Sequence, residues 1–103
     1  MKREIFEEKF ELANEIISPL FKTEIKKSNE QLGEKTKLVI CMEEAAKLSQ
    51  AISKYYRNKP DRLNLIEEIG DMVICIESLK QLYSIEDKEI CKAINVKIDR
   101  GVS

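Results

Sequence analysis

Histidine and tryptophan are absent from this 103-residue chain, and cysteine, proline and glycine are scarce. The lack of histidine excludes Ser-His and Cys-His nucleophilic pairs, imidazole general bases and histidine-containing metal sites. The cysteines Cys41, Cys75 and Cys91 are odd in number and form no C-x-x-C pair, so they predict neither a disulfide framework nor a thiolate zinc site. We expect each to fill apolar space as a reduced thiol. Any chemistry therefore depends on carboxylates, amines and hydroxyls.

A long apolar run and an excess of one charge are also missing. No apolar segment approaches the roughly 20 residues that a membrane span needs, and the opening MKREIFEEKFEL is too acidic for a signal peptide. The 18 basic and 19 acidic side chains leave a formal charge of −1, which gives no general attraction to nucleic acid or to an anionic membrane. We expect a cytoplasmic protein with neither a membrane nor a nucleic acid polymer as its partner.

The composition favours a single all-α domain over residues 1–103. Glu, Lys, Leu and Ile dominate, and only three Gly and two Pro interrupt the chain, which is typical of helices joined by short connections. A chain this short buries a limited core, and its aromatic content is only 6%. We therefore expect an antiparallel bundle of four to five helices that is completed by association with further copies.

Apolar spacing and turn signals predict where the helices lie. An apolar stripe runs along residues 4–17, and Ser18-Pro19 then ends this helix or opens a second one that reaches Leu32. Gly33 is the predicted break after it. Residues 1–35 would thus form an N-terminal helical segment.

Three further helices are predicted within a core at residues 36–100, namely at 36–57, 60–83 and 88–100. The first two are joined by a short Pro-Asp link and should pack antiparallel. The second is apolar around its whole circumference at 72–76, which predicts a central position in the bundle. On the first, the residues expected to face the core recur at steps of four and three: Leu38, Met42, Ala45, Ser49, Ile52 and Tyr56.

Acidic residues interrupt this core pattern. Glu43 and Glu44 lie within the 36–57 helix, and Glu68 and Asp71 lie one turn apart on one face of the 60–83 helix. The helix macrodipole favours acids only in a first turn, and Asp71 lies too deep in its helix for that explanation. Apolar residues continue its line toward the C-terminus, so we expect this face to be half-buried.

Desolvated carboxylates need compensation by a cation or by hydrogen bonds. The residues leave two readings open here: a metal site, or a salt-bridged edge of the core. Because only oxygen donors are available, with Glu44 supplied by the neighbouring helix, a bound ion would be Mg²⁺ or Mn²⁺. Gly70 slightly favours the metal-site interpretation, since a glycine inside a helix usually marks a close approach of two helices or space for a ligand.

Three segments carry a wider pattern: VICMEEAAKLSQAISK, then NLIEEIGDMVICIESLKQLYSIED, then KIDR. Together they resemble the MazG-like all-α nucleoside triphosphate pyrophosphohydrolases, whose hallmark is E-E-x-x-E on one helix and E-x-x-D on the next. The similarity covers about two thirds of the chain. It implies hydrolysis of a (deoxy)nucleoside triphosphate to the monophosphate and pyrophosphate, with Mg²⁺ held by the acidic cluster.

The resemblance assigns roles to individual acids. Glu44, with Glu43 beside it, matches the first motif, and Glu68 and Asp71 match the second, so Glu44, Glu68 and Asp71 are the expected metal ligands. Glu43 or Glu44 would be the general base. Lys47 stands where the family has the last Glu of E-E-x-x-E, and a protonated lysine cannot coordinate a metal. Either it neutralises the carboxylates in place of an ion, or one Mg²⁺ binds and Lys47 contacts phosphate.

Substrate contacts are expected on two helices. The family holds phosphates with basic and amide residues near the C-terminal end, where this chain has Asn95, Lys97 and Arg100. Lys and Arg are also ordinary near a helix C-terminus, where they oppose the macrodipole. Lys54 lies seven residues after Lys47, hence on the same helical face, and either contacts the substrate or is simply solvated.

The leading hypothesis is a Mg²⁺-dependent nucleoside triphosphate pyrophosphohydrolase that acts as a homodimer or homotetramer. A second is a catalytically impaired MazG-like helical module that binds nucleotide or a partner protein, and Lys47 is the residue that supports it. A third is a structural bundle whose acids are all salt-bridged.

Overall fold

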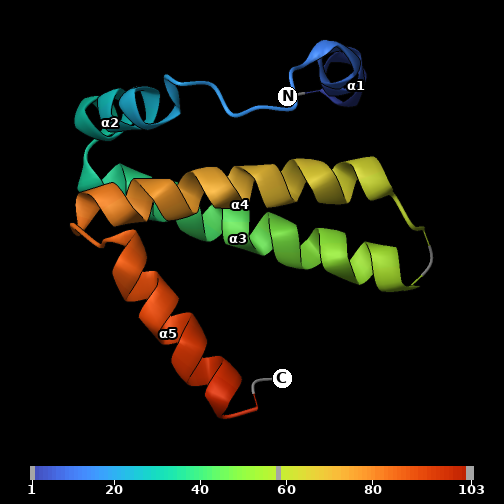
Figure 1. Cartoon of the computed structure of the whole chain (residues 1–103). Coiled ribbons are helices and arrows are strands. Elements are labelled where there is room, and N and C mark those ends of the chain that lie inside the picture. The colour runs from blue at the N-terminus through green and yellow to red at the C-terminus, as the bar shows by residue number, and fades with distance from the viewer. Residues whose placement is uncertain (1, 58, 102–103) are drawn as a thin grey trace.

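The computed structural model describes residues 2–57 and 59–101, and it is all-helical over those residues (Figure 1). The chain forms five α-helices in the order α1 (Arg3–Leu12), α2 (Phe21–Leu32), α3 (Glu34–Arg57), α4 (Arg62–Leu82) and α5 (Asp87–Asp99). This confirms the predicted all-α class and the five-helix order. The end of each of the last four helices lies within one residue of its predicted position.

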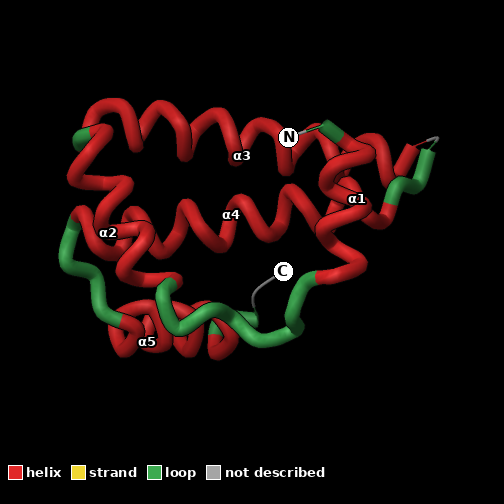
Figure 2. The backbone as a smooth tube through the Cα atoms, turned by 90° about the horizontal axis from the view of Figure 1, so that it is seen from above, coloured by secondary structure: helices red, strands yellow, loops and turns green. Residues whose placement is uncertain are grey.

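The long helices α3 and α4 form an antiparallel pair, and they lie side by side in both views (Figures 1 and 2). The short link between them contains Pro60, and Asp61 then caps α4, because its Oδ1 accepts a hydrogen bond from the backbone N–H of Asn64 at 3.1 Å. The predicted antiparallel packing of these two helices is therefore confirmed.

Helix α2 packs across one end of this pair and contacts both of its helices. Asn29 donates from Nδ2 to the backbone oxygen of Ser78 at 3.2 Å and accepts a hydrogen bond from the hydroxyl of the same serine. Both residues are buried. Gly33 makes the predicted break between α2 and α3 at a φ of +83°, a conformation that a residue with a side chain rarely adopts.

The first helix ends at Leu12, five residues earlier than predicted. Ile16 and Ile17, which belong to the predicted stripe, are 84% and 67% exposed in the segment that follows. Most helix stability in proteins comes from packing an apolar face, and α1 buries no residue on a neighbour. The stripe alone was therefore insufficient to extend the helix.

The prediction of which face of α3 is buried was wrong. The line that packs on α4 contains Lys37, Cys41, Glu44, Leu48 and Ala51, each buried or half-buried. The predicted line lies outside it: Leu38 is half-buried, but Met42, Ile52 and Tyr56 are 64%, 53% and 88% exposed. Apolar content did not identify the buried face of α3, because the face that packs on α4 carries acidic residues.

Helix α4 contacts both α2 and α3, but its apolar circumference is not covered by the rest of the chain. Cys75 is buried, whereas Val73, Ile74 and Ile76 are each more than 40% exposed. No helix among the described residues is long and apolar enough to cross a membrane.

The cysteines differ in environment. Cys41 and Cys75 are buried free thiols, as predicted, and burial, followed by a side-chain interaction with the neighbouring Cys41 thiol, raises the pKa of Cys75 to about 12. Cys91 is exposed, so the prediction that it fills apolar space was wrong. It lies on α5, a helix with no buried residue that diverges from the α3–α4 pair (Figure 1).

Candidate metal centre

Three carboxylates from α3 and α4 converge where the two helices are in close contact. Cys41 donates its thiol to the backbone oxygen of Cys75 across the interface at 3.9 Å. Glu44 lies one turn beyond Cys41, and Asp71 lies one turn before Cys75, with Glu68 a further turn away on the same line. One oxygen from each of Glu44, Glu68 and Asp71 lies within 4.8 Å of the others. The structure thus brings together the three predicted metal ligands.

Two oxygens of this carboxylate trio have no partner. Oε2 of Glu44 and Oε2 of Glu68 are buried and accept no hydrogen bond from any described residue. A buried acceptor without a donor costs the free energy of removing it from water, and the cost is larger for a charged group. A cation between the helices would compensate both oxygens, so the residues present fit a hard divalent ion.

The carboxylates also raise one another's pKa values. Burial, the charge of Glu44 and a hydrogen bond with Glu44 raise the pKa of Asp71 to about 6. Burial, followed by the charges of Glu44 and Glu67, raises the pKa of Glu68 above its ordinary value. Upward shifts in two acids of one cluster mean that repulsion and desolvation outweigh the positive charge nearby.

Lys47 compensates the trio only in part. Its Nζ lies 3.3 Å from Oε1 of Glu44, and this contact is the main reason that the pKa of Lys47 is raised. The lysine side chain is 56% exposed, so it approaches Glu44 from the solvent side. The other oxygen of Glu44 stays unpaired in spite of this contact.

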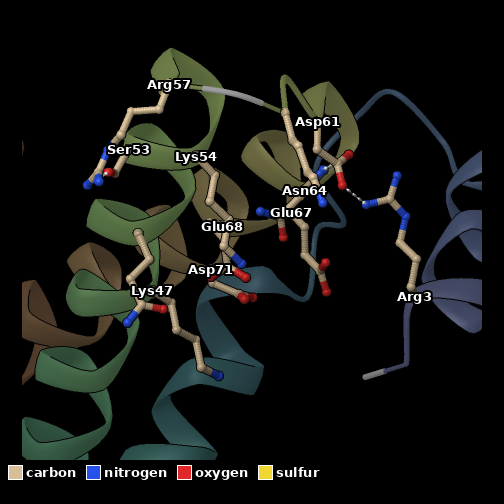
Figure 3. Close-up of a pocket in the computed structure, with 12 residues that line it drawn as sticks. Arg3, Lys47, Ser53, Lys54, Arg57, Asp61, Asn64, Glu67, Glu68 and Asp71 are labelled. Carbon is tan, nitrogen blue, oxygen red and sulfur yellow. Dashed lines mark hydrogen bonds and ion pairs between the residues drawn. The ribbon is translucent and has the colours of Figure 1, made fainter.

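A cleft of about 970 Å³ opens beside the trio, between the second half of α3 and the first half of α4 (Figure 3). Among the described residues, all the side chains that line it are polar, and none belongs to an aromatic or aliphatic residue. The lining comprises Arg3, Lys47, Gln50, Ser53, Lys54, Arg57, Lys59, Asp61, Asn64, Glu67, Glu68 and Asp71. The part of the lining that α4 supplies near the trio is acidic, and the α3 side of the cleft is basic.

Helix α1 reaches this cleft through one ion pair. Arg3 Nη1 lies 2.7 Å from Oδ2 of Asp61, the residue that caps α4 (Figure 3). The hydrogen bonds from Arg3 and from the backbone of Asn64 lower the pKa of Asp61. The two partners are 58 positions apart, so no local sequence signal could have indicated the contact.

The other predicted site residues have different outcomes. Lys47 and Lys54 line the cleft. Glu43, a predicted general base, is exposed and belongs to neither the trio nor the lining, because it lies one position away from the buried line. The three predicted phosphate contacts of the C-terminal region lie on or just after α5, outside the cleft lining: Asn95, Lys97 and Arg100.

Several cleft residues were missed by sequence reasoning. Gln50, Ser53 and Arg57 line the cleft from α3 together with Lys47 and Lys54. A polar line at steps of three and four was therefore visible beside the acidic motif, but it resembles any solvated helix face. Glu67 and Asn64 likewise line the cleft from α4.

Comparisons of the chain with protein-family models, with curated proteins and with solved structures gave no match.

Proposed function

We propose that this protein is a Mg²⁺-dependent pyrophosphohydrolase of the MazG-like kind, which converts a (deoxy)nucleoside triphosphate to the monophosphate and pyrophosphate. The observation that carries the proposal is the carboxylate trio, in which two buried oxygens lack a partner at the end of a polar cleft. The motif resemblance supports the reaction class. Mn²⁺ is the alternative ion, because it accepts the same oxygen donors.

Glu44, Glu68 and Asp71 would hold the ion, and their oxygen-only donor set suits Mg²⁺. When bound, the ion supplies Lewis-acid chemistry that neutralises phosphate charge and makes water a better nucleophile. Lys47 lines the cleft beside the trio, where its ammonium group can contact a phosphate oxygen. Among the carboxylates, Glu67 lines the cleft beside the trio without belonging to it. It is therefore better placed than Glu43 to accept a proton from water.

Pyrophosphate release from several nucleoside triphosphates, with Mg²⁺ or Mn²⁺ present, tests the proposal. Glu68→Gln should lower the rate by on the order of 100-fold or more, since losing even an outer-shell partner of a metal site costs about 10- to 100-fold. Glu43→Gln is the matched control, because it neutralises an exposed acid outside the cleft. No pyrophosphate from any triphosphate, together with no metal-dependent thermal shift, would remove the enzyme proposal.

The ion pair between Lys47 and Glu44 favours a second candidate, a non-catalytic helical module that binds nucleotide or a partner protein. Lys47→Glu separates the two functions. It should change the rate modestly if the native site works, and create or greatly increase activity if Lys47 has replaced the ion. Lys92→Glu, the same change at an exposed position of α5, controls for the altered net charge.

The proposed enzyme works as a homodimer or homotetramer. Its support is the apolar surface that the chain leaves uncovered on α3 and α4, including Met42, Ile52 and Val73. Large contiguous apolar patches are typical of association surfaces.

A further inference from the structure

Among the described residues, three cations on the α3 side of the cleft form no ion pair with an acidic side chain. Lys54 and Arg57 lie in the last turn of α3, and Lys59 follows in the link to α4. Within residues 2–57 and 59–101, none of the three forms an ion pair within 4.0 Å. The remaining cleft cations, Arg3 and Lys47, are paired. Three of the five cations that line the cleft therefore have no ion-pair partner within 4.0 Å among the described residues, although, in addition to the hydrogen bond from Arg3, the charge of Lys54 contributes to the lowered pKa of Asp61.

The helix macrodipole explains only part of this arrangement. It favours cations in a last turn, and so accounts for Lys54 and Arg57. Lys59 lies outside the helix yet lines the same cleft. Like charges three residues apart on a helix repel one another, and a bound anion would relieve that repulsion.

The two cations on α3 line the cleft at different distances from the trio. Lys54 extends toward Glu68 and Asp71, while Arg57, one turn farther along α3, lies beside Ser53 and points away from the Lys54 side chain (Figure 3). Arg57 uses Nη2 to donate to the Ser53 hydroxyl. A guanidinium group has five N–H donors, so Arg57 retains donors for an anion.

The lining also indicates which part of a ligand is recognised. A nucleobase is normally held by stacking on aromatic or apolar side chains, and no aromatic or aliphatic residue within 2–57 and 59–101 lines the cleft. Tyr55 and Tyr56 are exposed on α3 outside the lining. Cations and a carboxylate trio suited to a metal ion instead match several anionic oxygens in a row.

We propose that the cleft is an oligophosphate site, in which Lys54, Arg57 and Lys59 bind the phosphates that extend away from the metal centre. The site recognises the phosphate chain and not the nucleobase. This inference deepens the proposed function and rests on it for the metal ion. Inorganic tripolyphosphate is therefore expected to bind about as tightly as a nucleoside triphosphate.

Isothermal titration calorimetry on the full chain with Mg²⁺ at constant ionic strength tests the inference. The probes are inorganic tripolyphosphate and the α,β-methylene analogues of adenosine and uridine triphosphate. We expect the three Kd values to agree within about threefold, a difference under 1 kcal/mol. The double variant K54A/R57A should weaken all three by about tenfold or more, because two charge-assisted contacts are lost.

K26A/K92A is the matched control, since it removes two exposed cations from α2 and α5 and should leave each Kd within about twofold of wild type. Lys59→Ala tests the contribution of the cation in the link between α3 and α4. Circular dichroism checks that each variant is folded. Binding of the nucleotide analogues with tripolyphosphate more than tenfold weaker would overturn the inference. So would equal affinities for K54A/R57A and its control, or no binding at all.

The same experiments distinguish a failure of this inference from a failure of the proposed function. Oligophosphate binding that depends on Lys54 and Arg57, without pyrophosphate release from any triphosphate, would keep the inference and remove the enzyme. Release at equal rates and KM values from wild type and K54A/R57A would keep the enzyme and overturn the inference.

Discussion

Glu44 is only half-compensated in the described structure. Its Oε1 lies 3.3 Å from the ammonium group of Lys47, while its Oε2 is buried without a hydrogen-bond donor. Lys47 approaches from the solvent side and pairs with one oxygen of Glu44. It does not pair with the buried oxygens of Glu44 and Glu68 between α3 and α4. An ion between the helices and a lysine at the edge can therefore coexist, and Lys47 need not exclude the metal.

The raised pKa of Asp71 predicts a pH-dependent stability in the absence of metal. The pKa is about 6 in the folded protein and 3.8 for the ordinary side chain, so between these values the folded state binds more protons. Stability from this group is therefore present at low pH and is lost as pH rises through about 6. Asp71→Asn should be more stable than wild type at pH 7.5, by about 1 kcal/mol after allowance for solvent screening.

Thermal unfolding of both proteins in EDTA, from pH 4.5 to 7.5, checks this prediction. The difference between the two matters, because carboxylates with lowered pKa values, such as Asp61 and Asp87, act in the opposite direction in both proteins. With Mg²⁺ present, the advantage of Asp71→Asn should vanish or reverse. An Asp71→Asn advantage that is independent of pH would contradict the assigned shift.

At the scale of the helix, the boundaries of α3 follow from local signals but its orientation does not. Gly33 and the Pro60-Asp61 link define its ends through backbone preferences of single residues. Its rotation about its own axis depends on what α4 presents, and α4 presents acids and a cysteine. The face of α3 that meets them contains Cys41, Glu44 and Ala51.

Asp61 joins two elements, and its substitution should separate their contributions. Asp61→Ala removes the cap of α4 and the ion pair with Arg3, so we expect the midpoint of thermal unfolding to fall by about 4 °C or more. Asp61→Asn retains a capping oxygen and should lower it less. Arg3→Ala is the matched control, because it breaks the ion pair and keeps the cap. Equal midpoints for Asp61→Ala and Arg3→Ala would show that the cap contributes nothing.

The whole molecule leaves much apolar surface exposed. Uncovered side chains occur on α3 and α4, and α5 carries an apolar groove formed by Ile90, Ala93, Ile94, Lys97 and Ile98. Burying a large aliphatic side chain contributes about 1.5–3 kcal/mol, so contacts between copies would recover considerable stability. In such an assembly the five helices of one chain would form only part of a larger core.

The assembly prediction is tested by light scattering coupled to size-exclusion chromatography. Wild type should elute as a dimer or tetramer, and the double variant I52K/V73K should shift toward the 12.0 kDa monomer, because lysine cannot be buried unpaired. Thr23→Lys, on the exposed side of α2, should leave the mass unchanged. A monomeric wild type would contradict the prediction.

The order of the helices and the ends of the last four could be predicted from the chain alone, because they depend on turn residues and apolar spacing, which act over a few positions. The convergence of Glu44 with Glu68 and Asp71 was predicted from the antiparallel packing and from the motif resemblance, and not from the apolar pattern of α3. The rotation of α3, the contact of Arg3 with Asp61 and the polar lining of the cleft could not be predicted, since each depends on which surfaces meet in space. The exclusion of Glu43 from the trio has the same cause: a shift of one position turns a helical side chain by about 100°, and packing against α4 sets which position faces inward.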